Sequence, residues 1–531
     1  MIKNRYLKIT NKKKIIGIIS LLFLFAAYCA ISIGQSWDEA FHLLQGKITA
    51  DYLVTFGYID NPLYYREYYS PIYFLFSHLV TNLFPNNLEV PIQHLTNMVT
   101  SFTALFGISK ITKELFNKQV SYYAFIILFF YPIFFGHMGI NGKDIILATC
   151  HVWMTYSILR YLKKRTNKYI VSIGILAAIG TGIQLLYLGS FLTIIIFVTI
   201  DIFLVKKFIN KNFKRSKFLI DLIKCFIIFY FFLILFWIDV HPNIIKLPIT
   251  IFKQLFSDTY FTGWAYNLVN GNYYLSTEVP KSYFLINFFY KTPFYIIFLY
   301  ILFIYFTFKF SDYFRNKFKD YIYKLLFILC LMVLPNLLIL TLSFPIYDGL
   351  RLFLWSIPYF VIIPSLVIYF LLDNIKLKKT KASLLILFIF FIYFLYNFFL
   401  LTPFQYSYLN ILAGNSKDNY KIFENDYWGV STKELIKHSK LEKNKELKIT
   451  LCGMNSAVVS KYLKEFGYDK FSIVGDDDKA EYVFMTNRAV GEKSQDNSRD
   501  GITNCYEKFK GKEINSVTRN GNKLSIIRKI N

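Results

Sequence analysis

Three short stretches of the sequence carry ionisable residues that could do chemistry at the edge of a membrane. Residues 35–42, 136–144 and 344–351 read QSWDEAFH, GHMGINGKD and FPIYDGLR, and each adjoins an apolar run. Their ionisable side chains are those of Asp38, Glu39, His42, His137, Lys143, Asp144, Tyr347, Asp348 and Arg351. A carboxylate can take a proton as a general base, whereas Arg and Lys can bind a phosphate. The three stretches therefore predict a site that binds a hydroxyl and a phosphate.

The composition indicates that a membrane bundle must position these residues. The chain has 531 residues, of which 55% are hydrophobic and 20% aromatic. This excludes an ordinary soluble globular protein. The formal net charge of +26 does not call for nucleic acid, because the basic residues cluster in turns between apolar runs. The six cysteines lack the spacing of a zinc site.

The apolar runs predict a mainly α-helical, polytopic bundle over residues 1–402. A membrane-spanning helix needs about 20 apolar residues, and about eleven segments meet this requirement. They are 15–34, 93–111, 119–136, 144–162, 169–187, 189–205, 218–238, 292–309, 322–343, 352–372 and 382–402. No small-residue cleavage site follows the first segment, so we expect an uncleaved helix there.

The charges in the turns predict the orientation of the bundle. If the N-terminus is cytoplasmic, every even-numbered turn is strongly basic, as in RYLKKRTNKY and KKFINKNFKRSK. The odd-numbered loops are poor in Lys and Arg or mixed. Because Lys and Arg favour the cytoplasmic side, we expect a multi-pass protein of the cytoplasmic membrane whose three polar stretches lie outside.

The segments outside the predicted bundle include two long loops and a C-terminal domain. Loops 35–92 and 239–291 are rich in Tyr and Phe, which is typical of interfacial helices, and stretch 58–76 suits membrane anchoring better than sugar binding. Residues 403–531 predict a small extracytoplasmic α/β domain with a hairpin at Asn520 and Gly521. Cys452 and Cys505 fall in this domain, either as a disulfide or as two thiols.

One reaction needs carboxylates, a lysine and an arginine at the boundary between lipid and water. It is the transfer of a sugar from a lipid-linked phosphate, in which the acceptor hydroxyl needs a base and the leaving phosphate needs a cation. The apolar cores of the predicted spans hold almost no ionisable residues, whereas an ion-coupled transporter would carry some there.

Each stretch also has a plainer interpretation when taken alone. The Asp38–Glu39 pair could be a solvated loop end, and NGKD could be a turn with a helix cap. Arg351 could extend to lipid headgroups. His42 lies three residues after Glu39, so it could bind a metal, or it could bond to a neighbour. Because all these residues fall on the predicted outer side of the membrane, we favour a functional site over the separate plainer interpretations.

Four motifs resemble those of a known family. They are WDE, GHMGINGKDI, YDGLR and YSYLN…FENDYWGVSTKEL, and they resemble the bacterial dolichyl-phosphate-mannose–protein mannosyltransferase-like proteins of the GT-C superfamily of integral membrane glycosyltransferases. The resemblance covers residues 36 to 435, and the DYWG motif at 426–429 is specific. NGKD has Gly142 where the family usually has proline. Residues 440–531 resemble no family.

The resemblance implies a GT-C-like fold and an inverting transfer of a hexose or pentose from a polyprenyl-phosphate donor at the outer face. It implies that Asp38 is the base, with Glu39 and Asp144 as further acidic groups of the catalytic site. It also implies that the donor phosphate is bound by Lys143, Arg351 and His137. The residues that it implies for ordering loops or contacting substrate are His42, Tyr347, Asp348, Asp426 and Trp428.

The family implies no certain cofactor, because the superfamily includes metal-dependent and metal-independent members. If a divalent metal takes part, its predicted ligands are Asp38, Glu39, His42 and Asp144. The acceptor is left open between a protein, a lipid and a glycan. Competing hypotheses are a transporter or flippase of lipid-linked glycans, a ligase that moves an oligosaccharide, and a scaffold without catalysis.

Overall fold

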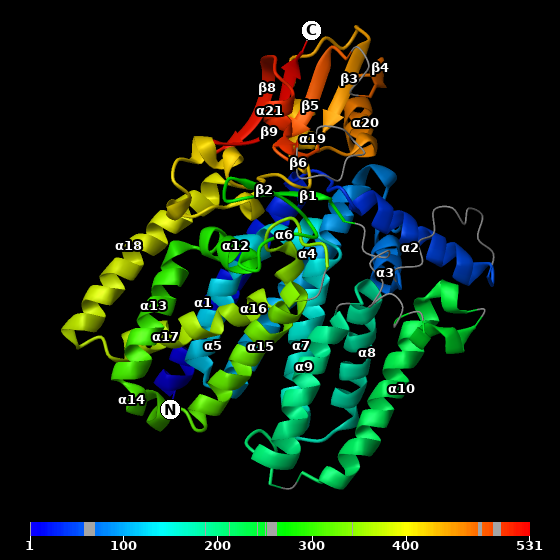
Figure 1. Cartoon of the computed structure of the whole chain (residues 1–531). Coiled ribbons are helices and arrows are strands. Elements are labelled where there is room, and N and C mark those ends of the chain that lie inside the picture. The colour runs from blue at the N-terminus through cyan, green and yellow to red at the C-terminus, as the bar shows by residue number, and fades with distance from the viewer. Residues whose placement is uncertain are drawn as a thin grey trace.

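A computed structural model gives the fold of the chain (Figure 1). It describes residues 2–57, 70–185, 187–211, 213–241, 243–249, 251, 263–341, 344–475, 480–491 and 501–530. Residues 58–69 of the aromatic stretch and 252–262 of the second long loop lie outside this part. The described chain is mainly helical, and a small C-terminal sheet lies at the end of the bundle opposite the N-terminus (Figure 1). This confirms the predicted fold class.

The described part of the first half of the chain contains helices joined by turns and loops, and no strand. Its helices are α1 (Ile2–Ser32), α2 (Glu39–Val54), α3 (Ile72–Thr81), α4 (Glu89–Leu115), α5 (Lys118–Phe129), α6 (Pro132–Ile140), α7 (Asp144–Lys163), α8 (Asn167–Ile183), α9 (Tyr187–Ile200) and α10 (Phe218–Phe236).

The second half adds helices and all the described strands. The helices are α12 (Tyr283–Lys291), α13 (Phe294–Lys309), α14 (Ser311–Lys317), α15 (Tyr321–Thr341), α16 (Ile357–Phe360), α17 (Ile362–Asp373), α18 (Lys378–Leu400), α19 (Thr432–Lys437), α20 (Ser456–Glu465) and α21 (Cys505–Lys508). The strands are β1 (Tyr266–Val269), β2 (Asn272–Leu275), β3 (Leu447–Cys452), β4 (Phe471–Ile473), β5 (Tyr482–Thr486), β6 (Ala489–Val490), β7 (Thr503–Asn504), β8 (Lys512–Arg519) and β9 (Asn522–Lys529).

Many of the helices are long and apolar enough to cross a membrane. Among the described residues, six helical segments meet that requirement, or up to eight if each of two bent pairs forms one span. Every predicted span coincides with helical structure, but α8 has only 17 residues. Segment 352–372 is divided between a 3-10 turn, α16 and α17. The number of spans stays a prediction.

Two prolines bend helix pairs near the sheet end of the bundle. Pro132 begins α6, which is bent by 64° from α5, and Pro293 lies between α12 and α13, which are bent by 112°. Proline has no backbone N–H, so it is tolerated in the first turn of a helix and breaks a helix interior. The bends place α6 and α12 near the sheet end (Figure 1).

The C-terminal sheet has five strands in the order β4-β3-β5-β9-β8. β3 is parallel to β4 and β5, whereas β9 is antiparallel to β5 and β8. Asn520 and Gly521 join β8 to β9 with φ of 48° and 79°, as the predicted Asn-Gly hairpin requires. Cys452 and Cys505 form a disulfide bond, which settles the alternative left open by the sequence.

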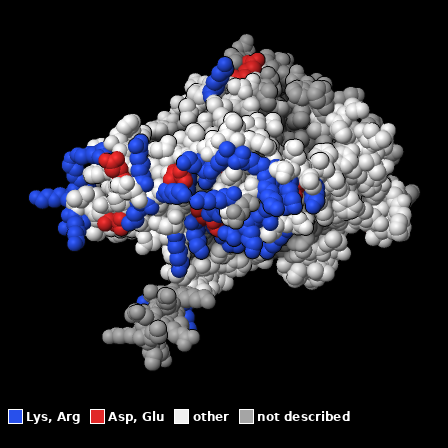
Figure 2. All heavy atoms as spheres, turned by 90° about the horizontal axis from the view of Figure 1, so that it is seen from below, with Lys and Arg blue, Asp and Glu red and all other residues white. Residues whose placement is uncertain are grey.

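The face opposite the sheet is strongly basic. Lys and Arg side chains gather there in Figure 2. The turns that join α7 to α8, α9 to α10 and α17 to α18 each carry exposed lysines or arginines, such as Lys164, Lys214 and Lys376, and so do the helix ends beside them. The basic turns from which we predicted the membrane orientation thus lie together on one face of the folded chain.

Candidate active site

Arg351 lies at the centre of the polar residues that meet between the bundle and the sheet. It begins a 3-10 turn (Arg351–Phe353), and 4% of its side chain is exposed. Its Nη1 lies 2.9 Å from Asp348 Oδ2 and 4.0 Å from Asp38 Oδ2, and its Nε lies 3.4 Å from Asp144 Oδ2. The structure therefore brings together three of the predicted acids around the predicted arginine.

A tight turn presents the guanidinium of Arg351 to these acids. Asp348 and Gly349 both have left-handed backbones, with φ of 59° and 65°. Glycine adopts this conformation freely, and Asp tolerates it better than most residues. A Cβ atom at Gly349 would lie 2.5 Å from Lys291 Nζ, so the turn needs glycine for space as well.

Two aromatic rings enclose the guanidinium. The Cζ of Arg351 lies 4.8 Å from the centre of the Tyr347 ring and 5.0 Å from that of Trp428. A cation over an aromatic face is attracted by the ring, and more strongly when water is excluded. Tyr347 and Trp428, both predicted from the motifs, thus contact the predicted phosphate-binding arginine.

Asp38 and Glu39 have different surroundings although they are adjacent. Asp38 precedes α2, and 41% of its side chain is exposed. Glu39 is turned inward, where its Oε2 accepts a hydrogen bond from the backbone N–H of Ser36 at 2.6 Å and its Oε1 lies 2.9 Å from His94 Nε2. Asp38 is therefore accessible to water, whereas Glu39 is buried and already paired.

The NGKD turn fixes Asp144 at the start of α7. Asn141 Oδ1 accepts hydrogen bonds from the backbone N–H groups of Lys143 and Asp144, and its Nδ2 donates to Asp144 Oδ2 at 3.1 Å. The first turn of a helix favours a carboxylate. Among the described residues, Asp144 Oδ1 and Arg351 Nε have no hydrogen-bond partner. Lys143, half-buried, lies between Asn141 and Asp144 in this turn.

His137 and the DYWG motif contact each other beside this site. His137 Nε2 lies 2.7 Å from Tyr427 Oη, and its ring meets Trp428 edge to face. Asp426 accepts hydrogen bonds from the Tyr406 hydroxyl and from the backbone N–H groups of the two residues before α19, Val430 and Ser431. Asp426 thus holds its loop, and Trp428 is the member of the motif that contacts Arg351.

The predicted metal ligands do not converge. His42 stacks on Phe74 with ring centres 4.3 Å apart, and burial lowers the pKa of His42 to about 4. Within the described ranges, no three His, Cys, Asp or Glu side chains are grouped so as to hold a metal ion. Glu39 is engaged by His94, and Asp38 and Asp144 face a guanidinium. These residues do not fit a divalent metal site.

Three further charged residues lie beside the cluster and were not predicted. Arg488 Nη2, from the segment after β5, lies 2.8 Å from Asp348 Oδ1. Lys291 Nζ lies 5.6 Å from the ring centres of Phe423 and Tyr427. Glu424 Oε1 accepts a hydrogen bond from the Ala489 N–H, and burial raises the pKa of Glu424 to about 7, against the opposing effect of Arg488.

The sequence carried little signal for these three residues. Glu424 lies in the FENDYWG motif, so proximity to Trp428 was its only indication. Lys291 is a single cation at the end of an apolar helix, and Arg488 lies in the part of the chain that resembles no family. Only the fold brings them to Asp348.

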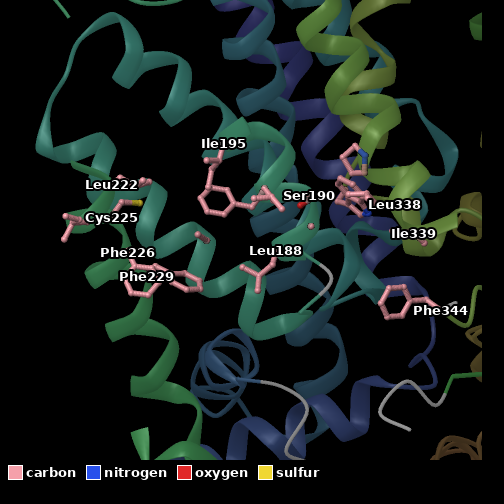
Figure 3. A pocket seen from close by; sticks show the side chains of 17 residues that line it. Leu188, Ser190, Ile195, Leu222, Cys225, Phe226, Phe229, Leu338, Ile339 and Phe344 are labelled. Carbon is pink, nitrogen blue, oxygen red and sulfur yellow. The ribbon is translucent and has the colours of Figure 1, made fainter. Parts of the chain in front are cut away.

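An apolar cavity of about 820 Å³ lies among the helices of the bundle (Figure 3). Its walls come mainly from α9, α10 and α15. Phe344 and Trp355, which lie before and after Arg351 in the sequence, also line it. The labelled side chains in Figure 3 are Leu188, Ser190, Ile195, Leu222, Cys225, Phe226, Phe229, Leu338, Ile339 and Phe344. The cavity is therefore large and apolar enough to hold a hydrocarbon chain.

Comparisons with known proteins agree with this architecture. Residues 68–237 match the family model described as dolichyl-phosphate-mannose-protein mannosyltransferase. The apo crystal structure of ArnT from Cupriavidus metallidurans matches with a TM-score of 0.52 and 10% sequence identity, over 97% of this chain and 98% of that chain. No curated protein sequence matches significantly.

Two further crystal structures match with lower TM-scores. ArnT from Cupriavidus metallidurans bound to undecaprenyl phosphate matches with 0.49 and 10% identity, over 96% of this chain and 97% of that chain. The apo oligosaccharyltransferase of Archaeoglobus fulgidus matches with 0.45 and 12% identity, over 88% of this chain and 69% of that chain.

The family match over residues 68–237 confirms the predicted resemblance to the dolichyl-phosphate-mannose–protein mannosyltransferase-like proteins, and the match to ArnT shows a shared fold. The shared fold and the long apolar helices support a multi-pass membrane protein.

Proposed function

We propose that the protein transfers one sugar from a polyprenyl-phosphate donor to an acceptor hydroxyl at the outer face of the cytoplasmic membrane. The observation that carries this proposal is the position of Arg351, a buried cation among three aspartates. An apolar cavity lined by Phe344 and Trp355, which lie before and after Arg351 in the sequence, adds support. The matched family's description names a dolichyl-phosphate sugar, which is a donor of this kind.

The donor lipid lies with its hydrocarbon chain in the apolar cavity and its phosphate beside Arg351. The cavity walls are apolar, as a chain of isoprene units requires. Arg351 binds the phosphate oxygens, and Lys143, next to Asp144 in sequence, adds a second positive charge. As the bond from sugar to phosphate breaks, negative charge grows on the phosphate, and these fixed cations stabilise it.

Asp38 removes the proton from the acceptor hydroxyl. It is the most exposed of the five predicted acids, with 41% of its side chain accessible, so an acceptor can approach it from water. The hydroxyl attacks the anomeric carbon from the face opposite the phosphate, and the configuration is inverted. The sugar then lies between Asp38 and the phosphate, so it replaces the long Asp38–Arg351 contact of 4.0 Å.

The remaining predicted residues position these groups. Asp144 and Asp348 orient Arg351, Trp428 and Tyr347 cover its guanidinium, and His137 supports Trp428. Domain 403–531, which we place outside the membrane, covers the site. Its helix α20 is joined to the first outer loop by the hydrogen bond from the Gln35 N–H to Tyr462 Oη at 2.7 Å.

A donor panel tests this proposal. The purified protein in lipid nanodiscs receives polyprenyl phosphates that carry different radiolabelled hexoses or pentoses, together with candidate protein, lipid and glycan acceptors. A glycosyltransferase releases free polyprenyl phosphate and labels one acceptor. Movement of intact donor across proteoliposomes without release would instead indicate a flippase, and transfer from an oligosaccharide pyrophosphate only would indicate a ligase.

A further inference from the structure

The C-terminal sheet contributes one charged side chain to the candidate site. Arg488 follows β5, and 4% of its side chain is exposed. Its Nη2 lies 2.8 Å from Oδ1 of Asp348, while Oδ2 of the same carboxylate lies 2.9 Å from Arg351 Nη1. Asp348 therefore bridges two arginines, one from the membrane bundle and one from the sheet.

The charges around Arg351 explain why a second arginine is needed. Arg351 faces three carboxylates within 4.0 Å, so its single charge is more than offset and a phosphate would be repelled. Arg488 neutralises the nearest of these carboxylates. Arg351, Arg488 and Lys143 then carry three positive charges against the three carboxylates, so an anion that arrives from the membrane is no longer repelled.

The surroundings of Arg488 hold it in this position. Its Cζ lies 4.2 Å from the centre of the Trp264 ring, and Trp264 Nε1 donates a hydrogen bond to the carbonyl of Ala489 at 2.9 Å. The Arg488 carbonyl accepts a hydrogen bond from the Cys505 N–H at 3.0 Å. Cys505 is bonded to Cys452 by the disulfide, so a covalent link on the sheet fixes the segment that carries Arg488.

We infer that Arg488 is a positioning residue, which pairs with Asp348 and thereby leaves Arg351 available for the donor phosphate. This inference rests on the proposed function, because it assigns a role in binding the same phosphate. It also gives the C-terminal sheet a part in the site.

Loss of the Arg488 charge should weaken donor binding more than it slows the chemical step. In Arg488→Met, Asp348 has only Arg351 to neutralise it, and donor KM rises by roughly 10- to 100-fold, the range expected for a charged hydrogen bond. Because kcat reports the bound complex, it changes by less. Arg488→Lys keeps the charge, so its KM stays within roughly 5-fold of the wild type.

Arg519 offers a matched control on the same sheet. Its guanidinium also pairs with a carboxylate, that of Glu434, and it lies over an aromatic ring, that of Phe404, at 5.1 Å. It joins the sheet to the end of α18 through the carbonyl of Thr402 at 3.0 Å. Arg519→Met therefore removes a similar contact between sheet and bundle without touching Asp348, and donor KM should be unchanged.

A double-mutant cycle in nanodiscs tests the inference. Binding of polyprenyl phosphate and turnover of the sugar donor are measured for the wild type, Arg488→Met, Asp348→Asn and the double variant. We expect the effect of Arg488→Met to fall below roughly 3-fold when Asp348 is already Asn, because the charge to be neutralised is gone. Three results would overturn the inference. The first is an Arg488→Met substitution that raises donor KM as much in the Asp348→Asn variant as in the wild type. The others are a wild-type donor KM for Arg488→Met, and a donor KM for Arg488→Lys as high as that of Arg488→Met.

The two proposals fail in different ways. A wild type that binds polyprenyl phosphate but turns over no donor overturns the proposed function alone. Equal affinity of the wild type and Arg488→Met for polyprenyl phosphate overturns the inference alone. A wild type that binds no polyprenyl phosphate overturns both.

Discussion

At the scale of single residues, the site depends on one buried guanidinium. Arg351 is enclosed by two rings and three carboxylates, all of which fix its position before substrate binds. Fixed charges aimed at a leaving group need no reorganisation during the reaction, which makes them effective in catalysis. This explains why a cation is kept where its burial is costly.

Arg351→Ala should lower turnover by about 10²–10³-fold, the usual cost of losing one such electrostatic contact. The assay is release of polyprenyl phosphate from labelled donor, with a melting curve to show that the variant is folded. Arg315→Ala is the control, because Arg315 is an exposed arginine of α14. Wild-type turnover by Arg351→Ala would remove Arg351 from the mechanism.

Glu424 should make the stability of the protein depend on pH. Burial raises its pKa to about 7, above the roughly 4.3 of an exposed glutamate. The folded state therefore binds the proton more tightly than the unfolded state. The stabilisation is complete below the unfolded value and is lost as the pH rises through about 7.

The measurement for Glu424 is the melting temperature between pH 5 and 8. The wild type should lose stability across this range, and Glu424→Gln should flatten the curve because the titrating group is removed. Glu446→Gln, at an exposed glutamate, should keep the slope of the wild type. Parallel curves for the wild type and Glu424→Gln would show that Glu424 does not titrate in this range.

At the scale of elements, the positions of short turns decide where the charges meet. The NGKD turn holds Asp144 at the start of α7, and the turn at Asp348 and Gly349 presents Arg351. Local sequence predicts such turns well, because Asn, Asp and Gly have distinct backbone preferences. The three polar stretches could therefore be identified from the sequence as parts of one site.

Gly349→Ala should impair activity because the new Cβ would displace Lys291. Its contact with Lys291 Nζ would be 2.5 Å, whereas a Cβ at Gly414 meets no atom within 4 Å. Both glycines have positive φ, 65° and 81°, so Gly414→Ala carries similar backbone strain without the contact. We expect at least roughly 10-fold lower turnover for Gly349→Ala than for Gly414→Ala, because a small misplacement of catalytic groups is costly. Equal turnover of the two variants would contradict this role for the turn.

The residues that the sequence missed are those that no local pattern marks. Arg488 and Lys291 reach Asp348 from segments far away in the chain, and each is a single cation without a repeated spacing. The roles of the predicted residues also needed the fold. Glu39 looks equivalent to Asp38 in the sequence, yet only the structure shows that it pairs with His94.

At the scale of the whole molecule, the basic face and the sheet lie at opposite ends of the bundle (Figures 1 and 2). The sequence predicted this polarity, because charge in the turns follows membrane orientation. It predicted less about the spans themselves. Apolar length does not reveal a bend, so the breaks at Pro132 and Pro293, and the division of segment 352–372, emerged only from the structure.

Reporter fusions test the orientation of the whole chain. Alkaline phosphatase, which is active only outside the cytoplasm, should be active when fused at Asn531 and inactive when fused after Lys376, in the turn between α17 and α18. A fluorescent protein that folds only in the cytoplasm should give the opposite pattern. Activity of both phosphatase fusions would contradict the proposed topology.

The central claim is that the protein transfers a sugar from a lipid phosphate at the outer end of the bundle, with Asp38 as the base and Arg351 as the residue that binds the phosphate. Its most direct test compares wild type and Asp38→Asn in nanodiscs with radiolabelled sugar on polyprenyl phosphate and an acceptor found in the donor panel. Donor binding is measured for both, because Asn keeps the size of Asp and removes its basicity. We predict that both bind donor and that only the wild type releases polyprenyl phosphate. Equal release by Asp38→Asn would contradict the account.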